Sequence, residues 1–265
     1  MTIPSYQTLA LSVDPRGIAC LTLNRPQVHN AMDAQMIAEL QQAAAWLAAQ
    51  AEVRGVVLSG TGKTFCAGGD LGWMRANMDK TRGQRVAESA ELARMLRALN
   101  ELPQPLIGRI NGPAYGGGVG MLSVCDIAIG VTTASYSLTE TRLGLLPANI
   151  APYVIARIGA TNSRRCMLTA RRITAAEAKD FGLLDEVVDA AELDAAIERE
   201  ITDLLQCAPS AVAATKRLIA YVGSHDLTTN MQYTADRLAD AWETTEGQEG
   251  VACFFDKQTP AWRKS

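Results

Sequence analysis

The first part of the chain alternates between short apolar runs and amphipathic segments. Residues 6–13 alternate polar and apolar side chains, and residues 18–23 form a second such run after a Pro-Arg-Gly turn. This pattern predicts a β-hairpin. Residues 33–51 carry apolar side chains at helical spacing behind Asp33, a residue type that caps helix N-termini well. A short apolar run follows at residues 53–59. The order strand, helix, strand predicts a parallel pair joined by a right-handed crossover.

Helical patterns dominate the second part of the chain. A long one spans residues 82–102, and from about residue 149 onward the only predicted strand is a short apolar run at 184–188. The predicted helices of this part cover residues 150–158, 161–169, 174–181, 190–205, 210–222, 227–242 and 248–255. Because only helices are predicted beyond about residue 200, we expect an α/β core followed by an α-helical C-terminal region.

The centre of the chain is rich in glycine. Two apolar runs, residues 105–110 and 125–129, predict buried strands and enclose a glycine cluster. Its four glycines fall within five residues: Gly116, Gly117, Gly118 and Gly120. A strand, a glycine turn and a helix start leave backbone N–H groups unpaired, and these can bind an oxygen that carries negative charge. Alternatively, the glycines only permit tight packing of a helix on a strand. A second glycine turn, at residues 65–71, follows the strand predicted at 53–59.

Composition narrows the classes of function. The 265 residues are 48% hydrophobic, enough for one large domain or a domain with an appendage. The net charge of −3 shows none of the basic bias of nucleic-acid-binding proteins. No apolar run reaches membrane-spanning length, and the first residues lack the pattern of a signal peptide. Six scattered cysteines without a C-x-x-C motif favour a reducing compartment over a zinc site or disulfides. We therefore expect a cytoplasmic protein that binds neither nucleic acid nor membrane.

Together these motifs resemble the crotonase family of enoyl-CoA hydratases and isomerases, over nearly the whole chain. The matching segments are Leu23–Pro26 with Asn30–Met32, Phe65–Leu71, Tyr115–Gly118 with Cys125 and Asp126, Glu140 with Gly144 and Pro147, Ala178 with Gly182 and Leu183, Glu186–Val188, and Glu249 and Gly250 with Phe254 and Lys257. The resemblance implies an α/β spiral of ββα repeats over residues 1–200. It also implies an α-helical C-terminal trimerisation region over residues 201–265, and a homotrimer or a dimer of trimers.

The resemblance also assigns chemical roles. The backbone N–H groups of Gly69 and Gly117 would bind the thioester oxygen of an acyl-CoA, on which charge builds as the acyl group becomes enolate-like. Glu140 would deliver or remove a proton at the acyl α-carbon, with its pKa raised by an apolar pocket. No metal or separate cofactor is implied, because coenzyme A is part of the substrate.

Further contacts with the substrate or its CoA are implied at nine residues: Arg25, His29, Ala67, Gly68, Asp70, Leu71, Gly120, Phe254 and Lys257. The resemblance places Phe254 and Lys257 at the nucleotide end, reaching it from a neighbouring subunit. Arg25 could equally be a surface charge, and Phe254 could equally pack in the core.

The departure from the family pattern is Gly120. Family hydratases with two glutamates carry the second one at this position, where it holds and activates water. Either Glu140 handles both proton transfers here, or the enzyme moves a proton between the α and γ carbons, as the family's Δ3,Δ2-enoyl-CoA isomerases do. The run 140–154 is similar to bacterial methylglutaconyl-CoA hydratases of leucine breakdown. Asn149 within it could hold water or a polar acyl group, or cap a helix.

We therefore predict an enoyl-CoA hydratase that acts on a short or branched 2-enoyl-CoA. The alternatives are an enoyl-CoA isomerase and a non-catalytic acyl-CoA-binding protein that kept the glycine loops.

Overall fold

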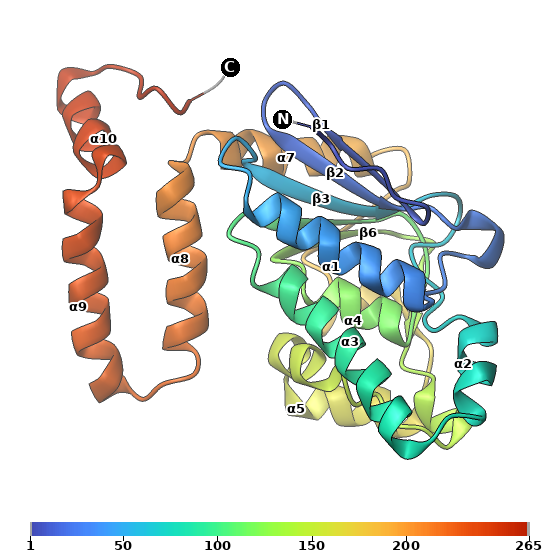
Figure 1. The fold of residues 1–265 in the computed structure, drawn as a ribbon. Coiled ribbons are helices and arrows are strands. Elements are labelled where there is room, and N and C mark those ends of the chain that lie inside the picture. The colour runs from blue at the N-terminus through green and yellow to red at the C-terminus, as the bar shows by residue number, and fades with distance from the viewer. Residues whose placement is uncertain (1, 264–265) are drawn as a thin grey trace.

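The computed structural model describes residues 2–263 and has an α/β body beside which three C-terminal helices stand (Figure 1). The main sheet has six strands in the order β1-β2-β3-β4-β6-β9. These strands are β1 (Leu9–Val13), β2 (Ile18–Leu23), β3 (Gly55–Gly60), β4 (Leu106–Ile110), β6 (Ile127–Val131) and β9 (Glu186–Val188). The predicted hairpin of β1 and β2 is confirmed as an antiparallel pair, and all other neighbours in this sheet are parallel.

Two long helices build the core on the sheet. In α1 (Ala34–Ala48), the apolar side chains at helical spacing are buried, and the Asp33 side chain accepts a hydrogen bond from the Met36 N–H at 2.9 Å. This is the predicted N-cap. The helix α3 (Arg82–Asn100) packs against α1. The predicted parallel pair of β2 and β3, joined through α1, is therefore confirmed.

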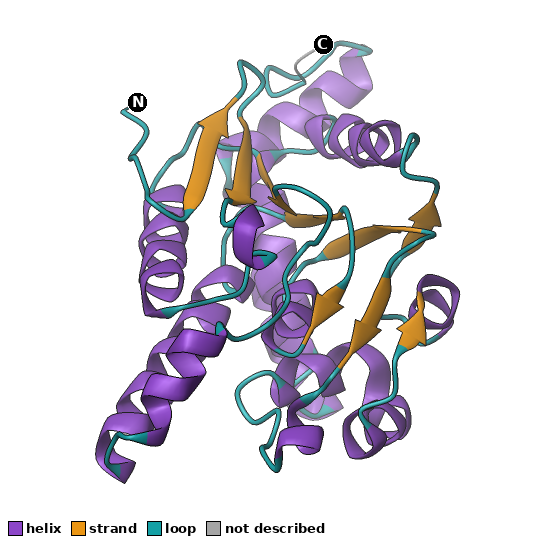
Figure 2. Cartoon of the chain, turned by 90° about the vertical axis from the view of Figure 1, so that its right-hand side faces the viewer, coloured by secondary structure: helices purple, strands orange, loops and turns teal. Residues whose placement is uncertain are grey.

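A second, three-stranded sheet consists of β5 (Ala114–Tyr115), β7 (Ser135–Ser137) and β8 (Ile173–Thr174). Figure 2 shows both sets of strands with helices packed around them. A single residue separates β5 from the short helix α4 (Gly117–Ser123), and six of the seven helix residues are buried. The glycine cluster therefore forms the turn between a strand and a helix, as the sequence predicts.

The remaining helices of the body are α2 (Leu71–Met78), α5 (Ala151–Thr169), α6 (Ala175–Asp180) and α7 (Leu193–Leu205). The sequence did not predict α2. In α5, the two helices predicted separately follow one another across Gly159, whose φ of 71° and ψ of 165° interrupt the helical backbone. Glycine accepts this conformation without the steric cost that other residues incur.

The C-terminal helices are α8 (Pro209–Val222), α9 (Leu227–Glu243) and α10 (Thr245–Asp256). The core extends beyond the predicted boundary at residue 200, because α7 continues to Leu205 and buries Ile201 and Leu205. The tail is joined to the body by Arg54, which donates to the carbonyl oxygens of Cys207 at 2.7 Å and Trp262 at 2.9 Å. Across residues 2–263, no helix combines the length and apolarity needed to cross a membrane.

Candidate active site

The two glycine loops lie against each other. Cys66 forms an isolated parallel bridge with Ala114, and its carbonyl oxygen accepts the Tyr115 N–H at 3.0 Å. Gly68 has a φ of 93°, and a Cβ there would lie 2.8 Å from the Tyr115 carbonyl oxygen and 3.7 Å from the Gly117 nitrogen. The close approach of the two backbones therefore requires glycine at position 68. The sequence did not predict this contact between the two loops, because they lie far apart in the chain. The structure brings both predicted loops together.

Each loop contains a predicted oxyanion residue whose backbone N–H group is unpaired in the part of the chain that the structure describes. Within residues 2–263, neither the Gly69 N–H nor the Gly117 N–H donates a hydrogen bond. Gly117 is the first residue of α4, where N–H groups have no partner within the helix. The hydrogen bonds of the bridge between Gly69 and Met32 involve the two neighbours of Gly69. The Met32 N–H donates to the Gly68 carbonyl oxygen at 2.7 Å, and the Asp70 N–H donates to the Met32 carbonyl oxygen at 2.8 Å. Two such amides are suited to an oxygen on which negative charge develops.

The packing explanation for the glycines also holds. A Cβ at Gly117 would overlap the Cε of Met32, and one at Gly118 would lie 2.9 Å from the Cβ of Cys66. The Cys66 thiol is fully buried, and this burial raises its pKa to about 12. It therefore stays a neutral thiol, and its sulfur accepts the Gly68 N–H at 3.4 Å. The tight packing and the free amides belong to one turn, so the two explanations are not exclusive.

Glu140 lies beside the glycine turn. It begins a short 3-10 helix, η2 (Glu140–Leu143), and its side chain is half-buried. A Cβ at Gly116 would lie 3.0 Å from the Glu140 Oε1. The other oxygen, Oε2, is buried and receives no hydrogen bond from the part of the chain that the structure describes. Desolvation therefore raises the pKa of this carboxyl group above its ordinary value. A partly desolvated carboxyl group with one free oxygen beside free amides can transfer protons near neutral pH.

The raised pKa of Glu140 predicts a pH-dependent stability. In the native state the group titrates above the ordinary value of 4.5, so it contributes stability below pH 4.5 that is lost as pH rises through the native pKa. Glu140→Gln removes the titrating group and hence this loss. We expect the difference in melting temperature, variant minus wild type, to grow as the pH rises from 4.5 to 8. Thermal melts across this range measure it, and a difference independent of pH would contradict it.

Gly120 is packed against the start of α5. A Cβ at this position would lie 2.8 Å from the Cβ of Ile150 and closer still to its Cγ2, and the Ile150 side chain is 2% exposed. The structure therefore places Gly120 under Ile150 and does not leave it open to a ligand, in contrast to the substrate contact predicted for it. The aliphatic side chain of Ile150 therefore occupies the space that a side chain at position 120 would need.

Asn149, next to Ile150, makes its hydrogen bonds to α3. Its side-chain amide donates to the Ser89 carbonyl oxygen at 3.1 Å and to the Ser89 Oγ at 2.8 Å. The N-cap residue of α5 is Ile150, without a side-chain cap, so Asn149 does not take the capping role, one of the two roles that the sequence left open for it. Asn149 instead ties the 144–150 segment to α3.

Comparison with known proteins establishes the family. The family model described as enoyl-CoA hydratase/isomerase matches residues 14–265. The chain belongs to the enoyl-CoA hydratase/isomerase family. An enoyl-CoA hydratase of Alternaria alternata is 32% identical over 243 residues, which cover 90% of this chain and 78% of that protein.

Solved structures agree with this family and with the predicted crotonase fold. An enoyl-CoA hydratase from Shewanella pealeana is 36% identical, with a TM-score of 0.93 over 97% of this chain and 96% of that one. Pseudomonas aeruginosa AtuE is 37% identical, with a TM-score of 0.94 over 97% of this chain and all of that one. The mixed α/β body and the helical C-terminal region are thus confirmed as a crotonase fold, while a particular closeness to methylglutaconyl-CoA hydratases stays a prediction.

Arg25 and His29 were predicted to contact CoA, and the structure gives them different surroundings. The guanidinium of Arg25 forms ion pairs with Asp33 at 3.0 Å and Asp70 at 3.2 Å, and it is only 17% exposed. Arg25 is therefore not a free surface charge in this member of the hydratase/isomerase family. His29 is exposed, and its Nδ1 lies 3.2 Å from the Thr64 Oγ1. Of the two side chains, that of His29 is the more exposed to solvent.

The other predicted CoA contacts divide between the first glycine loop and the tail. Ala67 and Gly68 belong to the loop beside Gly69, the Asp70 carboxylate caps α2, and Leu71 is 82% exposed at the start of that helix. Phe254 is 80% exposed on α10, so it does not pack in the core of its own chain. Lys257 is the C-cap residue of α10, with a φ of 55°. Figure 1 shows α10 on the far side of α8 from the body.

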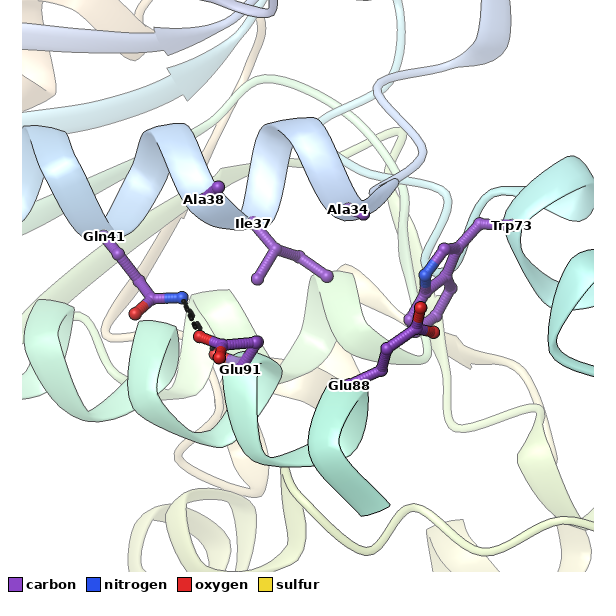
Figure 3. A pocket seen from close by; sticks show the side chains of 7 residues that line it. All are labelled: Ala34, Ile37, Ala38, Gln41, Trp73, Glu88 and Glu91. Atoms are coloured by element: carbon purple, nitrogen blue, oxygen red, sulfur yellow. Dashed lines mark hydrogen bonds between the residues drawn. The ribbon is translucent and has the colours of Figure 1, made fainter. Parts of the chain in front are cut away.

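Sequence reasoning missed Trp73, which borders the first glycine loop. A Cβ at Gly69 would lie 3.6 Å from the Cζ3 of this indole. The same ring lines a cavity of about 100 Å³ between α1, α2 and α3 (Figure 3). The lining residues are Ala34, Ile37, Ala38, Gln41, Trp73, Glu88 and Glu91. Because α2 itself was not predicted, no pattern placed Trp73 near the site; the available signal was Asp70, whose side chain caps α2 by accepting from the Gly72 and Trp73 N–H groups.

Proposed function

We propose that the protein is an enoyl-CoA hydratase that adds water to a short or branched 2-enoyl-CoA. One observation supports it above the others. The desolvated carboxyl group of Glu140, whose Oε2 receives no hydrogen bond from the described residues, lies against Gly116, in the same turn as the free N–H of Gly117. An acid–base group and an oxyanion donor are thus adjacent, which is the arrangement that an enolate-forming reaction needs.

In the proposed mechanism, the amides of Gly69 and Gly117 bind the thioester oxygen. Glu140, as a carboxylate, takes a proton from water while the water oxygen bonds to the β-carbon. The electron pair of the C=C bond moves to the α-carbon and the thioester oxygen, which forms the enolate. Glu140 then gives its proton to the α-carbon on the same face, so the addition is syn. Losing one of the two oxyanion donors typically costs on the order of 3 kcal/mol of barrier. These steps use no cofactor besides the CoA of the substrate.

We propose 3-methylglutaconyl-CoA as the substrate and leucine degradation as the context. The support is the similarity of the run 140–154 to methylglutaconyl-CoA hydratases. The cytoplasmic location predicted from the scattered cysteines belongs to this proposal as well.

The second candidate is a Δ3,Δ2-enoyl-CoA isomerase, and the packing of Gly120 under Ile150 favours it. With no carboxylate at position 120, one group can shuttle a proton from the α-carbon to the γ-carbon, and the double bond moves without any net addition. The third candidate, a non-catalytic acyl-CoA-binding protein, gives no reason for a desolvated Glu140 at the glycine turn.

We also propose a homotrimer or a dimer of trimers. The C-terminal helices expose large apolar side chains that a single chain leaves in water, and such a surface is typical of an interface. These exposed apolar residues include Ile219, Leu227, Met231, Leu238, Trp242, Phe254 and Phe255. In such an assembly, Phe254 and Lys257 would meet a ligand bound to a neighbouring subunit. Light scattering tests this, and a monomer at micromolar concentration would contradict it.

The deciding experiment incubates the protein with 3-methylglutaconyl-CoA, crotonyl-CoA and a 3-enoyl-CoA, and follows the products by mass spectrometry. Hydration adds the mass of one water, and the fastest substrate identifies the acyl chain. Conversion of the 3-enoyl-CoA to an isomer of equal mass, without hydration, would make the protein an isomerase. Binding of all three esters without turnover would favour the non-catalytic protein.

A further inference from the structure

We infer that Arg25 is a positioning residue that holds the oxyanion amides in place, and that it does not bind CoA. This inference rests on the proposed function, because it takes the Gly69 and Gly117 amides as the groups that bind the thioester oxygen. It concerns the Arg25 guanidinium, which lies on the segment after β2 and contacts two helix N-termini.

Three groups of the protein surround this guanidinium: two carboxylates that form ion pairs with it and one carbonyl oxygen that accepts a hydrogen bond from it. Its Nη2 lies 3.0 Å from the Asp33 Oδ2, and its Nη1 lies 3.2 Å from the Asp70 Oδ2. The same Nη1 donates to the Ala31 carbonyl oxygen at 2.6 Å. The planar, forked guanidinium suits several acceptors at fixed angles, which a lysine ammonium does not reproduce. With its side chain 17% exposed, Arg25 has little surface left for a phosphate.

The two carboxylates are themselves the caps of helices. Asp33 accepts from the Met36 N–H at the start of α1, and Asp70 accepts from the Gly72 and Trp73 N–H groups at the start of α2. A cap carboxylate fixes where a helix begins, and the positive end of the helix stabilises its charge. Arg25 therefore joins the N-termini of α1 and α2, and Asp70 is the residue directly after Gly69.

Residues 31–33, which include two of the Arg25 contacts, pack against both Gly69 and Gly117. Met32 lies between Ala31 and Asp33, and its backbone hydrogen bonds join it to both neighbours of Gly69. Its side chain ends against Gly117, where a Cβ would overlap the Cε of Met32. A shift of this segment therefore moves the Gly69 amide through the backbone and removes packing from Gly117. A misplacement of about 1 Å at such a site costs roughly 100-fold in rate.

The test compares Arg25→Lys and Arg25→Gln with wild type, and uses Arg97→Lys and Arg97→Gln as matched controls. Arg97 is 71% exposed and pairs with Glu101, one helical turn away, so its loss should change neither binding nor rate. The readouts are kcat, KM and the absorption of a bound conjugated enoyl-CoA. This chromophore shifts to longer wavelength when donors polarise its thioester oxygen.

For Arg25→Lys we expect a loss of more than half of the red shift and a fall in kcat of tenfold or more, up to about 100-fold. The dissociation constant of the CoA ester should change by less than about threefold, since positioning acts on the transition state. Asp70→Asn should reproduce this split between kcat and binding. If Arg25→Gln fails to fold, the lysine and asparagine variants still decide, because both keep a polar side chain of similar size.

The opposite result would overturn the inference. An Arg25 that binds a CoA phosphate predicts a dissociation constant raised about tenfold or more, with kcat and the red shift kept. Arg25→Lys would then leave the binding of a substrate without the 3′-phosphate unchanged. A positioning role predicts instead that Arg25→Lys has the same effect on substrates with and without this phosphate.

Failure of the proposed function is distinguishable from failure of the inference. If the wild type shows the red shift without hydration, the hydratase proposal is wrong. The absorption of the bound enoyl-CoA in the Arg25 variants would then still test the positioning role of Arg25. A wild type that binds the ester without any red shift would overturn both.

Discussion

Replacing Glu140 with glutamine is expected to reduce kcat by about 1,000-fold, within the usual range for a general acid–base group. The amide has nearly the size and shape of the carboxyl group, so the packing against Gly116 is kept. It can neither take a proton from water nor return one to the α-carbon. Because the free amides of Gly69 and Gly117 stay in place, KM should change by less than about threefold. Steady-state kinetics on the preferred enoyl-CoA measure both quantities.

Glu101→Gln is the matched control for this substitution. Glu101 lies at the end of α3, where its side chain is 56% exposed and pairs with Arg97. Its kinetics should equal those of wild type, because exposed ion pairs contribute little. If Glu140→Gln kept more than about a tenth of the wild-type kcat, another group would have to be the acid–base catalyst.

The pH profile gives an independent check on the role of Glu140. Hydration needs the carboxylate form, so kcat/KM should fall as pH drops through the pKa of Glu140 in the free enzyme. Burial raises that pKa, so the acidic limb should lie above pH 4.5. The residual activity of Glu140→Gln should lack this limb.

Replacing Gly120 with glutamate is expected to destabilise the fold by about 3 kcal/mol or more, because overpacking and an unpaired buried charge both contribute. The Cβ alone would lie 2.8 Å from the Cβ of Ile150, and position 120 is buried. Urea denaturation measures the free energy of unfolding. A variant as stable as wild type would mean that position 120 is open and that a second carboxylate fits there without rearrangement.

Two further variants separate overpacking from a general intolerance of glutamate. Gly83→Glu lies in the first turn of α3, where a Cβ would meet its nearest neighbour, the Thr81 Oγ1, only at 4.0 Å. A negative charge near a helix N-terminus is favourable, so this control should be neutral or stabilising. Adding Ile150→Ala to Gly120→Glu removes the overlapping side chain and should recover part of the lost stability. No recovery would indicate that the buried charge alone is responsible.

Local patterns in the sequence determined much of the fold. The alternation before and after the Pro-Arg-Gly turn gave the β1–β2 pair, and Asp33 marked the start of α1. These features depend on residues close together in the chain, so periodicity and capping reveal them. Helix α2 was missed because it spans only eight residues and presents no buried face; its side chains are partly or fully exposed.

The chemical identity of the site was also visible in the sequence, as two glycine turns and a lone glutamate in an order typical of the family. What the sequence could not decide was how those parts are held. The pairing of Arg25 with Asp70 joins residues 45 positions apart, and the contact of Gly120 with Ile150 joins residues 30 apart. Neither contact follows from periodicity, because it depends on where the main sheet and α5 bring distant segments together.

The sequence by itself therefore determined much of the element order, and through its resemblance to the family it named Gly69, Gly117 and Glu140 as candidates for the oxyanion amides and the acid–base group. Only the tertiary structure decided that Arg25 is turned inward to two helix caps, that Ile150 fills the space over Gly120, and that the buried Oε2 of Glu140 has no hydrogen-bond partner among the described residues. The physical reason is that charge pairing, steric exclusion and desolvation depend on distances in space, which the chain sets only once it has folded.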